Sequence, residues 1–158
     1  TLISLSINGK IVLGIADFPA LNERYVGYGK ISYKLINNNK KILKAKSNSL
    51  SKSILSSTST YAFKNKNDKN TFEKILKKVK TVHMGGDCYQ YCLLADGYID
   101  IVLESGLNSY DIRALIPIVK NSGGSIKTWD GEDPKNGGKV IATSSRKLLS
   151  TVQSLVVK

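Results

Sequence analysis

Apolar residues follow different patterns in the two halves of this 158-residue chain, and that difference constrains its fold more than any other feature. Short β-rich runs separated by polar turns fill most of residues 1–80, with a lysine-rich segment and one helical pattern near the end. Helix-like and strand-like segments then alternate through residues 81–158. Strands followed by such alternation favour a layered α/β fold. We therefore predict an antiparallel β meander followed by alternating strands and helices.

The first half contains a strong hairpin signal. The dipeptide Asn8-Gly9 separates the β-rich runs LISLSI and KIVLGIA, and Asn-Gly in this setting is typical of a two-residue hairpin turn. ERYVGYG and KISYKLI are predicted as further strands with a turn at NNNK, residues 37–40, and SILSSTS as a short strand. The run NTFEKILKKV predicts a helix, with Asn70 and Glu73 at the N-cap and N3 positions of a capping box.

The second half predicts three helices and three strands. CYQYCLLADG is predicted as a helix that Gly97 ends, and YIDIVLE as a strand. DIRALIPIVKNSGG is predicted as one helix capped by Ser109, followed by the strands SIKTW and KVIATS. The closing segment SSRKLLSTVQSLVVK has apolar residues at helical spacing, namely Leu148, Leu149, Val152, Leu155 and Val156.

The net charge of +12 is concentrated in one segment. Residues 30–80 hold 14 lysines against the two acids Asp68 and Glu73, a local excess of 12, so the rest of the chain is balanced. This segment has no arginine and lacks the interleaved aromatic residues of nucleic-acid-binding surfaces, so nucleic acid is not an expected partner. The segment is either an ordinary solvated surface or an electrostatic funnel for an anionic partner.

Other features narrow the class of protein. The longest apolar runs, such as ALIPIV at 114–119, are too short to span a membrane, and no leader is recognisable, so we expect a cytoplasmic protein with no membrane partner. Cys88 and Cys92 lie four apart in a helical pattern, which favours packing over a disulfide or metal site. His83, the only histidine, has no recognisable nucleophile, so a surface or strand-end position is expected.

Two acids frame the stretch ESGLNSYD. Glu104 is expected at the C-terminal end of a strand, and Asp111 in the first turn of the next helix. Ligands of open α/β sheets bind at the carboxyl ends of strands, where two carboxylates suit a cation or a substrate hydroxyl. The alternative is structural, because the helix dipole favours an acid in the first turn and a strand-end glutamate is commonly solvated.

A longer stretch around these acids resembles a known family. MGGDCYQYCLLADGYIDIVLESGLNSYDIRALIPIVKNSGGSI is similar to the C-terminal signature region of the inositol monophosphatase family, the Mg²⁺-dependent, lithium-sensitive phosphatases of sugar phosphates. The family pattern has a strand ending in Glu-x-Gly, then an aromatic-Asp pair opening a helix that ends in Gly-Gly. LGIADFPALNERYVGYG also resembles the sheet segment of that family. The resemblance covers nearly the whole chain and implies the C-terminal portion of the family's layered fold.

The resemblance also implies roles for particular residues. Asp111 corresponds to a carboxylate ligand of catalytic Mg²⁺, and Glu104 to a contact with a substrate hydroxyl or amine. Gly86, Asp87 and Cys88 correspond to a stretch that lines the substrate. The sequence Gly-Gly-Asp-Cys-Tyr and the Tyr-Asp pair most resemble the histidinol-phosphate phosphatase branch. An acid at position 87 would suit a substrate that bears an ammonium group.

The chain also departs from the family pattern. Tyr110 replaces the commoner tryptophan, and Arg113 stands where small residues are usual. The Glu-Glu pair and the Asp-Pro-x-Asp-Gly-Thr segment that build the family's main metal site do not occur in these 158 residues. We therefore expect a partial domain that lacks its N-terminal metal-binding half, in which residues 81–158 form the substrate-side subdomain.

Two functional hypotheses follow. In the first, the chain is the C-terminal part of a Mg²⁺-dependent phosphomonoesterase acting on a small phosphorylated substrate, with histidinol phosphate favoured and inositol phosphate next. Alone it would be inactive, because Mg²⁺ needs more oxygen ligands than one aspartate supplies. In the second, a non-catalytic protein binds an anionic partner through its lysine-rich face. In either case the first strands would expose apolar surface and sheet edges, so we expect a homo-oligomer, specifically a dimer.

Overall fold

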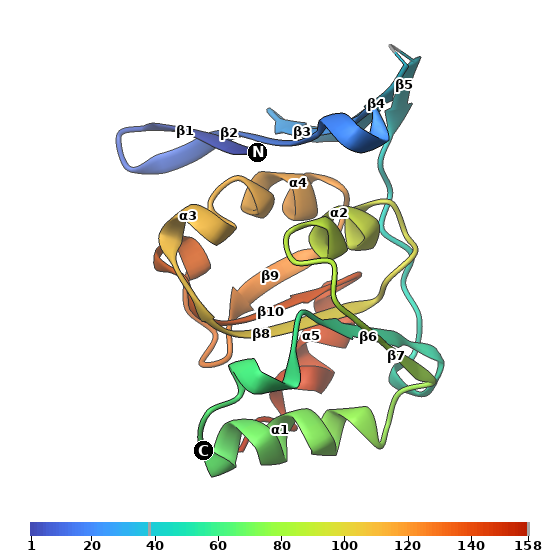
Figure 1. The fold of residues 1–158 in the computed structure, drawn as a ribbon, viewed down its shortest axis with the longest axis vertical. Helices are drawn as coiled ribbons and strands as arrows, with labels where there is room; N and C mark the ends of the chain where they lie inside the picture. Colours follow the sequence, from blue (N-terminus) through green and yellow to red (C-terminus); the bar gives the residue numbers. More distant parts are fainter. Residues whose placement is uncertain (38, 158) are drawn as a thin grey trace.

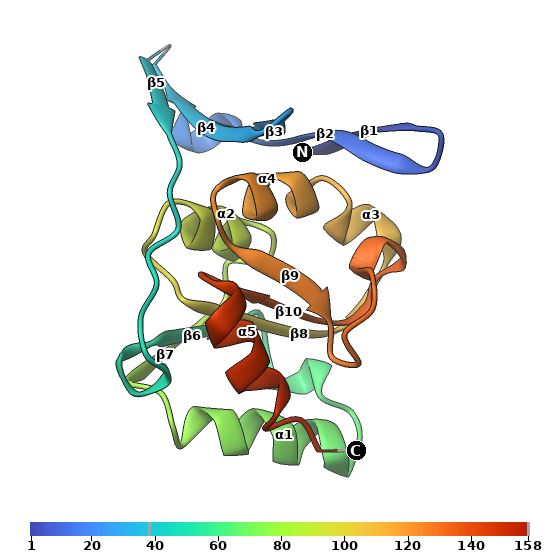
Figure 2. The same cartoon turned by 180° about the vertical axis from the view of Figure 1, so that it is seen from behind.

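The computed structural model describes residues 1–37 and 39–157, which form alternating layers of sheet and helix (Figure 1). A first sheet made by the N-terminal strands lies against a layer of three helices, α2, α3 and α4. A second sheet lies beneath these helices, and α1 and α5 cover its other face (Figure 2). The predicted fold class is confirmed.

The first sheet is an antiparallel meander in the order β1-β2-β3-β4-β5. Asn8 and Gly9 have φ angles of 49° and 74°, so both adopt the left-handed conformation that a type I′ hairpin turn requires, and the predicted hairpin is confirmed. The predicted turn at residues 37–40 includes Asn38, which lies outside the described residues. The strands are β1 (Leu2–Ile7), β2 (Lys10–Phe18), β3 (Glu23–Tyr28), β4 (Ile31–Ile36) and β5 (Asn39–Ile42).

The second sheet is mixed, in the order β7-β6-β8-β10-β9. β6 pairs in parallel with β7 and β8, whereas β10 pairs antiparallel with β8 and β9. The sequence does not predict β7, because this edge strand has no buried residue and therefore no apolar alternation. The strands are β6 (Ile54–Ser57), β7 (Thr81–Met84), β8 (Ile101–Leu107), β9 (Ser125–Thr128) and β10 (Gly138–Thr143).

The helices are shorter or shifted relative to the predictions. The predicted N-cap at Asn70 is wrong, because α1 is capped by Asn65, whose side chain accepts the backbone N–H of Asp68 at 2.9 Å. The closing helix ends at Gln153, so Leu155 and Val156 pack against the core from beyond it. The helices are α1 (Lys66–Leu76), α2 (Tyr89–Ala95), α3 (Ser109–Ile112), α4 (Leu115–Asn121) and α5 (Arg146–Gln153), with 3₁₀ turns η1 (Pro19–Leu21), η2 (Leu50–Lys52), η3 (Thr60–Ala62) and η4 (Pro134–Asn136).

The single helix predicted after Ser109 is two helices, and Pro117 explains the break. A proline inside a helix lacks an N–H and its ring clashes with the carbonyl four residues earlier, which here belongs to Arg113. The chain leaves α3 at Arg113 and starts α4 at Leu115, so Pro117 falls in the first turn, where no intrahelical N–H bond is needed.

Close contact between α4 and the first sheet depends on two glycines. Gly14 and Gly27 pair across β2 and β3, and a Cβ atom on Gly27 would lie 2.5 Å from the backbone nitrogen of Ile118. A Cβ atom on Gly14 would clash with the carbonyl oxygen of Ala114. The α4 backbone therefore rests directly on the sheet, as only glycine permits.

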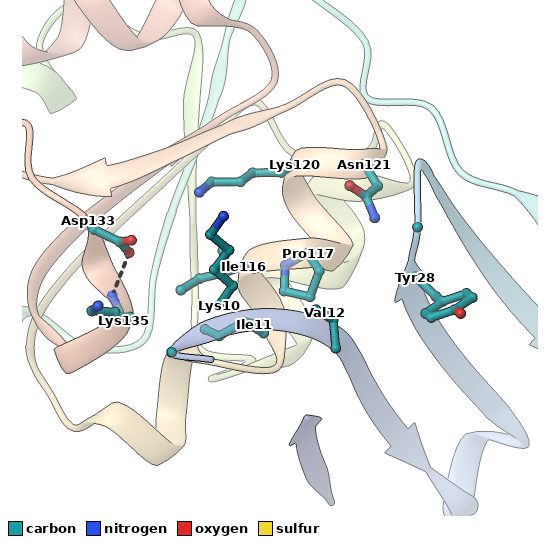
Figure 3. Close-up of a pocket in the computed structure, with 12 residues that line it drawn as sticks. Lys10, Ile11, Val12, Tyr28, Ile116, Pro117, Lys120, Asn121, Asp133 and Lys135 are labelled. Atoms are coloured by element: carbon teal, nitrogen blue, oxygen red, sulfur yellow. Dashed lines mark hydrogen bonds between the residues drawn. The ribbon is translucent and has the colours of Figure 1, made fainter. Parts of the chain in front are cut away.

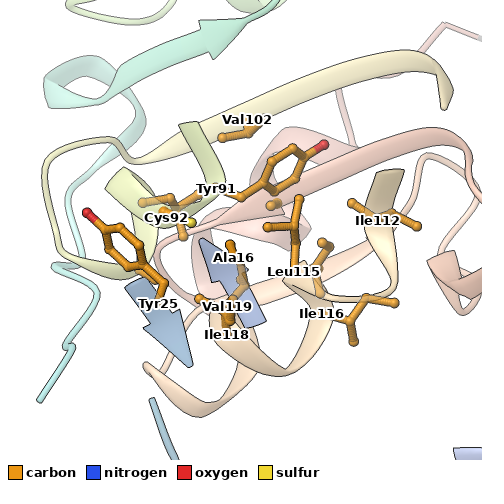
Figure 4. Close-up of a cluster of buried hydrophobic side chains, with 14 of the residues drawn as sticks. Ala16, Tyr25, Tyr91, Cys92, Val102, Ile112, Leu115, Ile116, Ile118 and Val119 are labelled. Carbon is orange, nitrogen blue, oxygen red and sulfur yellow. The ribbon is translucent and has the colours of Figure 1, made fainter. Parts of the chain in front are cut away.

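Two apolar clusters fill the spaces between layers. The cluster between the two sheets includes Tyr91, Leu115 and the fully buried Cys92, which is a free thiol as predicted (Figure 4). The second cluster lies between the second sheet and α1 and α5, and includes Phe72 and Trp129. Within residues 1–37 and 39–157, no helix is long and apolar enough to cross a membrane.

Candidate functional site

Glu104 lies inside a strand, which corrects the predicted strand-end position. β8 continues to Leu107, because Gly138 and Val140 of β10 pair with Leu107 and Glu104. The Glu104 side chain is therefore buried, with only 3% of the residue exposed, and is not the solvated acid of the structural alternative. The backbone N–H of Thr58 donates to its Oε1 at 2.7 Å, and Gln90 donates to the same oxygen from Nε2.

Burial sets the protonation behaviour of Glu104. Loss of solvent raises the pKa of Glu104 above its ordinary value, and the nearby Asp87 carboxylate adds to this effect. The hydrogen bonds from Thr58 and Gln90 lower the pKa but do not cancel the effect of burial. A buried carboxylate with both donors on one oxygen is fixed in orientation and can bond a hydroxyl or amine through the other.

Gln90 positions Glu104, and sequence reasoning did not single it out. Its side chain is fully buried on α2, where Nε2 also donates to Thr58 Oγ1 at 3.0 Å and Oε1 accepts from Ser56 Oγ at 2.7 Å. Ser56 Oγ lies 3.3 Å from Nδ1 of His83, which is exposed on β7 as predicted. The one available signal was a polar residue between apolar neighbours in a short buried helix.

The loop before α2 has an unusual backbone. Gly85, Gly86 and Asp87 all have positive φ, at 91°, 94° and 46°. Glycine adopts this conformation freely, and aspartate tolerates it better than most residues. The turn exposes Asp87 to solvent at the start of α2, while Cys88 is half-buried. Burial, and then the Asp87 charge, raise the pKa of the Cys88 thiol, which disfavours the thiolate form that a nucleophile requires.

Asp111 belongs to a capping box at the start of α3. Its Oδ2 accepts the backbone N–H of Asn108 at 2.8 Å, and the Asn108 side chain accepts the N–H of Asp111. The helix cap is therefore Asn108 and not the predicted Ser109. This geometry confirms the structural role considered for Asp111, but its bond uses only one carboxylate oxygen, so ligation through the other is compatible with it.

The predicted residues share one electrostatic environment. Asp87, Cys88, Glu104 and Asp111 all interact electrostatically with the fully buried hydroxyl of Tyr91, whose pKa is raised by burial first and by these groups next. Across the described part of the chain, however, no three His, Cys, Asp or Glu side chains are grouped closely enough to hold a metal ion. The family resemblance predicts Asp111 as a magnesium ligand. Mg²⁺ bound there would need further oxygen ligands besides the Asp111 carboxylate.

Polar side-chain contacts join the first sheet to the two ends of α2. Tyr89 donates its hydroxyl to Glu23 Oε2 at 2.8 Å, and Lys34 lies 2.9 Å from the other oxygen of Glu23. Lys34 also approaches Asp96, at the end of α2, at 3.4 Å, and Lys41 pairs with Asp96 at 2.6 Å. Side-chain contacts therefore tie both ends of α2 to the first sheet.

The stacked layers of sheet and helix define an α/β layered fold, in which Asp111 lies just after the junction between β8 and α3. Residues 1–157 match the model of the inositol monophosphatase family, and the chain belongs to this family. The resemblance inferred from the signature region is confirmed.

Individual relatives agree with this assignment. The chain is 40% identical over 132 residues to the bifunctional phosphatase IMPL2, chloroplastic, of Arabidopsis thaliana, a match that covers 84% of this chain and 37% of that protein. It is 26% identical over 147 residues to the histidinol-phosphatase of Mycobacterium tuberculosis, covering 91% and 56%. The chain thus spans about two-fifths to somewhat over half of these curated relatives.

A solved structure shows the same fold. An inositol monophosphatase from Zymomonas mobilis superposes with a TM-score of 0.89 and 36% identity, covering 98% of this chain and 61% of that one. The structure of inositol monophosphatase from Anabaena superposes with a TM-score of 0.84 at 23% identity, and this likeness concerns the fold alone.

Proposed function

We propose that this chain provides the substrate side of a Mg²⁺-dependent phosphomonoesterase that acts on a small phosphate monoester, with histidinol phosphate preferred over inositol phosphate. The observation that carries the proposal is the pairing of an exposed Asp87 with a buried, oriented Glu104. Two acids of this kind suit a substrate that presents an ammonium group. The names of the Mycobacterium tuberculosis and Arabidopsis relatives support the same reaction class.

Each side chain has a distinct task in this proposal. Asp87 attracts the ammonium group from the solvent side, and Glu104, held by Thr58 and Gln90, fixes the orientation of a substrate hydroxyl or amine. Asp111 would hold Mg²⁺ through the oxygen not used for helix capping. When bound with its full set of ligands, Mg²⁺ polarises the phosphoryl oxygens and lowers the pKa of a water molecule.

The need of Mg²⁺ for several oxygen ligands also bears on the phosphatase activity of the isolated chain. A single carboxylate binds Mg²⁺ weakly, because this ion retains its water shell unless several oxygens meet it in octahedral geometry. We therefore propose that the chain by itself has little or no phosphatase activity. Phosphate release from histidinol phosphate with Mg²⁺ checks this, and turnover of about 1 s⁻¹ or faster, in the ordinary range of enzymes, would contradict it.

Substrate preference can be tested without turnover. Calorimetry with histidinol phosphate and with inositol phosphate, in the presence of Mg²⁺, compares the chain with its Asp87→Asn variant. Loss of the Asp87 charge should weaken histidinol phosphate about fivefold to tenfold, as expected for one partly exposed ion pair, and leave inositol phosphate unchanged. Asp130→Asn, at an exposed loop acid, is the matched control. Equal weakening of both ligands would refute the assignment of Asp87.

The alternative function, anion binding through the lysine-rich face, has less support. Part of the charge excess is used inside the fold, since Lys34 is buried between two acids and Lys41 pairs with Asp96. The cytoplasmic location stays a prediction, and the name of the Arabidopsis relative places that protein in the chloroplast.

A further inference from the structure

A cavity of about 580 Å³ lies between the β1–β2 hairpin, α4 and η4 (Figure 3). Its volume is in the range of small-molecule sites. None of Gly86, Asp87, Cys88, Glu104 and Asp111 lines it, so it is separate from the candidate site.

The fold itself opens this cavity. Gly14 and Gly27 bring α4 against the middle of the first sheet, where no room remains for side chains. Towards the hairpin turn the pairing of β1 with β2 shifts at a bulge between Leu5 and Ser6, which bends the ribbon. The hairpin extends past α4 (Figure 1), and the space beneath it forms the cavity.

The walls of the cavity are apolar and its rim is cationic. Ile116 and Pro117 of α4 face Ile11 and Val12 of β2 (Figure 3). Lysines from three separate elements also line the cavity, namely Lys10 of β2, Lys120 of α4 and Lys135 of η4.

The three ammonium groups are available to a ligand. In the part of the chain that the structure describes, none of the three forms an ion pair. Among the described residues, Asp133 is the only acid that lines the cavity, and its carboxylate already accepts the backbone N–H of Lys135 at 3.1 Å as the cap of η4. Three lysines against one acid leave a local charge excess of two, which matches a dianion.

We propose that this cavity binds a small organic phosphate, with its phosphate group among Lys10, Lys120 and Lys135 and an apolar or aromatic group against Ile116 and Pro117. Lysines bind phosphate as mobile point charges, and a phosphate monoester carries up to two negative charges near neutral pH. The apolar wall adds affinity in proportion to the carbon surface that it covers. The ligand is therefore distinguished from inorganic phosphate by its apolar part.

Benzylphosphonate is a suitable probe, because it carries a dianionic head and an aromatic ring and has no ester bond to hydrolyse. Titration of the ¹⁵N-labelled chain should shift the amide signals of Gly9, Lys10 and Gly29, which line the cavity. Inorganic phosphate should bind at least fivefold more weakly, since it cannot use the apolar wall. Absence of shifts at these amides would overturn the proposal.

Charge variants separate this site from general attraction to a basic protein. Lys10→Ala combined with Lys120→Ala should weaken benzylphosphonate about tenfold. Lys74→Ala combined with Lys77→Ala removes the same charge from exposed positions around the C-terminal end of α1 and should change affinity less than twofold. Equal weakening by both pairs would mean that binding is non-specific. Benzylphosphonate shifts confined to the amide signals of Gly86, Asp87 and Cys88 would place the probe at the candidate site, and either result would refute the cavity.

Discussion

Two buried hydroxyls have no hydrogen-bond partner among the described residues, those of Ser57 and Tyr91. A buried hydroxyl without a partner costs about 1–3 kcal/mol, so its removal with the ring retained is stabilising. We expect Tyr91→Phe to raise the free energy of unfolding by about 1 kcal/mol in urea titrations. Tyr25→Phe is the control, because Tyr25 donates to Glu23 Oε2 at 2.9 Å, and its loss should destabilise. Destabilisation by Tyr91→Phe would contradict the absence of a partner.

Glu104 should give stability a characteristic dependence on pH. Since burial raises its pKa in the folded state, Glu104 favours folding below the ordinary value of 4.5, and this contribution is lost as pH rises through the raised pKa. Glu104→Gln should therefore gain stability relative to the unmodified chain as pH rises from 4.5 to 7. Thermal melts of both proteins across this range measure the difference.

Glu23 provides a control of opposite sign. Burial would raise the pKa of Glu23, but hydrogen bonds from Lys34, Tyr89 and Tyr25 outweigh it and lower the pKa. Its contribution is thus present above 4.5 and lost as pH falls. Glu23→Gln should lose stability relative to the unmodified chain as pH rises, and the same trend in both variants would show that neither carboxylate dominates.

At the scale of elements, features encoded by neighbouring residues could be predicted and features set by distant contacts could not. The hairpin at Asn8-Gly9 depends on two residues and was predicted correctly. The continuation of β8 past Glu104 depends on pairing with β10, far along the chain. For the candidate site, family resemblance supplied the residue identities, whereas the orientation of Glu104 by Gln90 required the structure.

The close approach of α4 to the first sheet can be tested at Gly14. Its alanine variant would place a methyl group against the carbonyl oxygen of Ala114. Because the clashing atom belongs to the backbone and not to a flexible side chain, a small local adjustment cannot relieve the clash. We expect Gly14→Ala to destabilise by about 3 kcal/mol, at the upper end of overpacking effects. Ser4→Ala, at the paired and exposed position on β1, should change stability by less than about 0.5 kcal/mol in the same urea titration. A small effect at Gly14 would mean that α4 can move away from the sheet.

For the whole molecule, the main feature is the outer face of the first sheet, which stays exposed in a single copy of the chain. The face opposite the helices has no covering layer in Figures 1 and 2. Its strands expose about half of several large apolar side chains, namely Ile3 (52%), Leu5 (50%), Tyr28 (61%) and Ile42 (56%). Several large apolar side chains exposed on one face of a sheet favour association.

Self-association through this face is therefore expected, with a second copy of the chain as the partner. Light scattering after size exclusion should show a dimer whose fraction increases with concentration. Ile3→Lys combined with Leu5→Lys should convert it to monomer, because two buried charges in an apolar interface are costly to desolvate. Leu21→Lys is the control, since Leu21 is 53% exposed but lies in η1 outside the sheet. A monomer at high concentration in the unmodified chain, or equal dissociation by Leu21→Lys, would show that this face does not join the two copies.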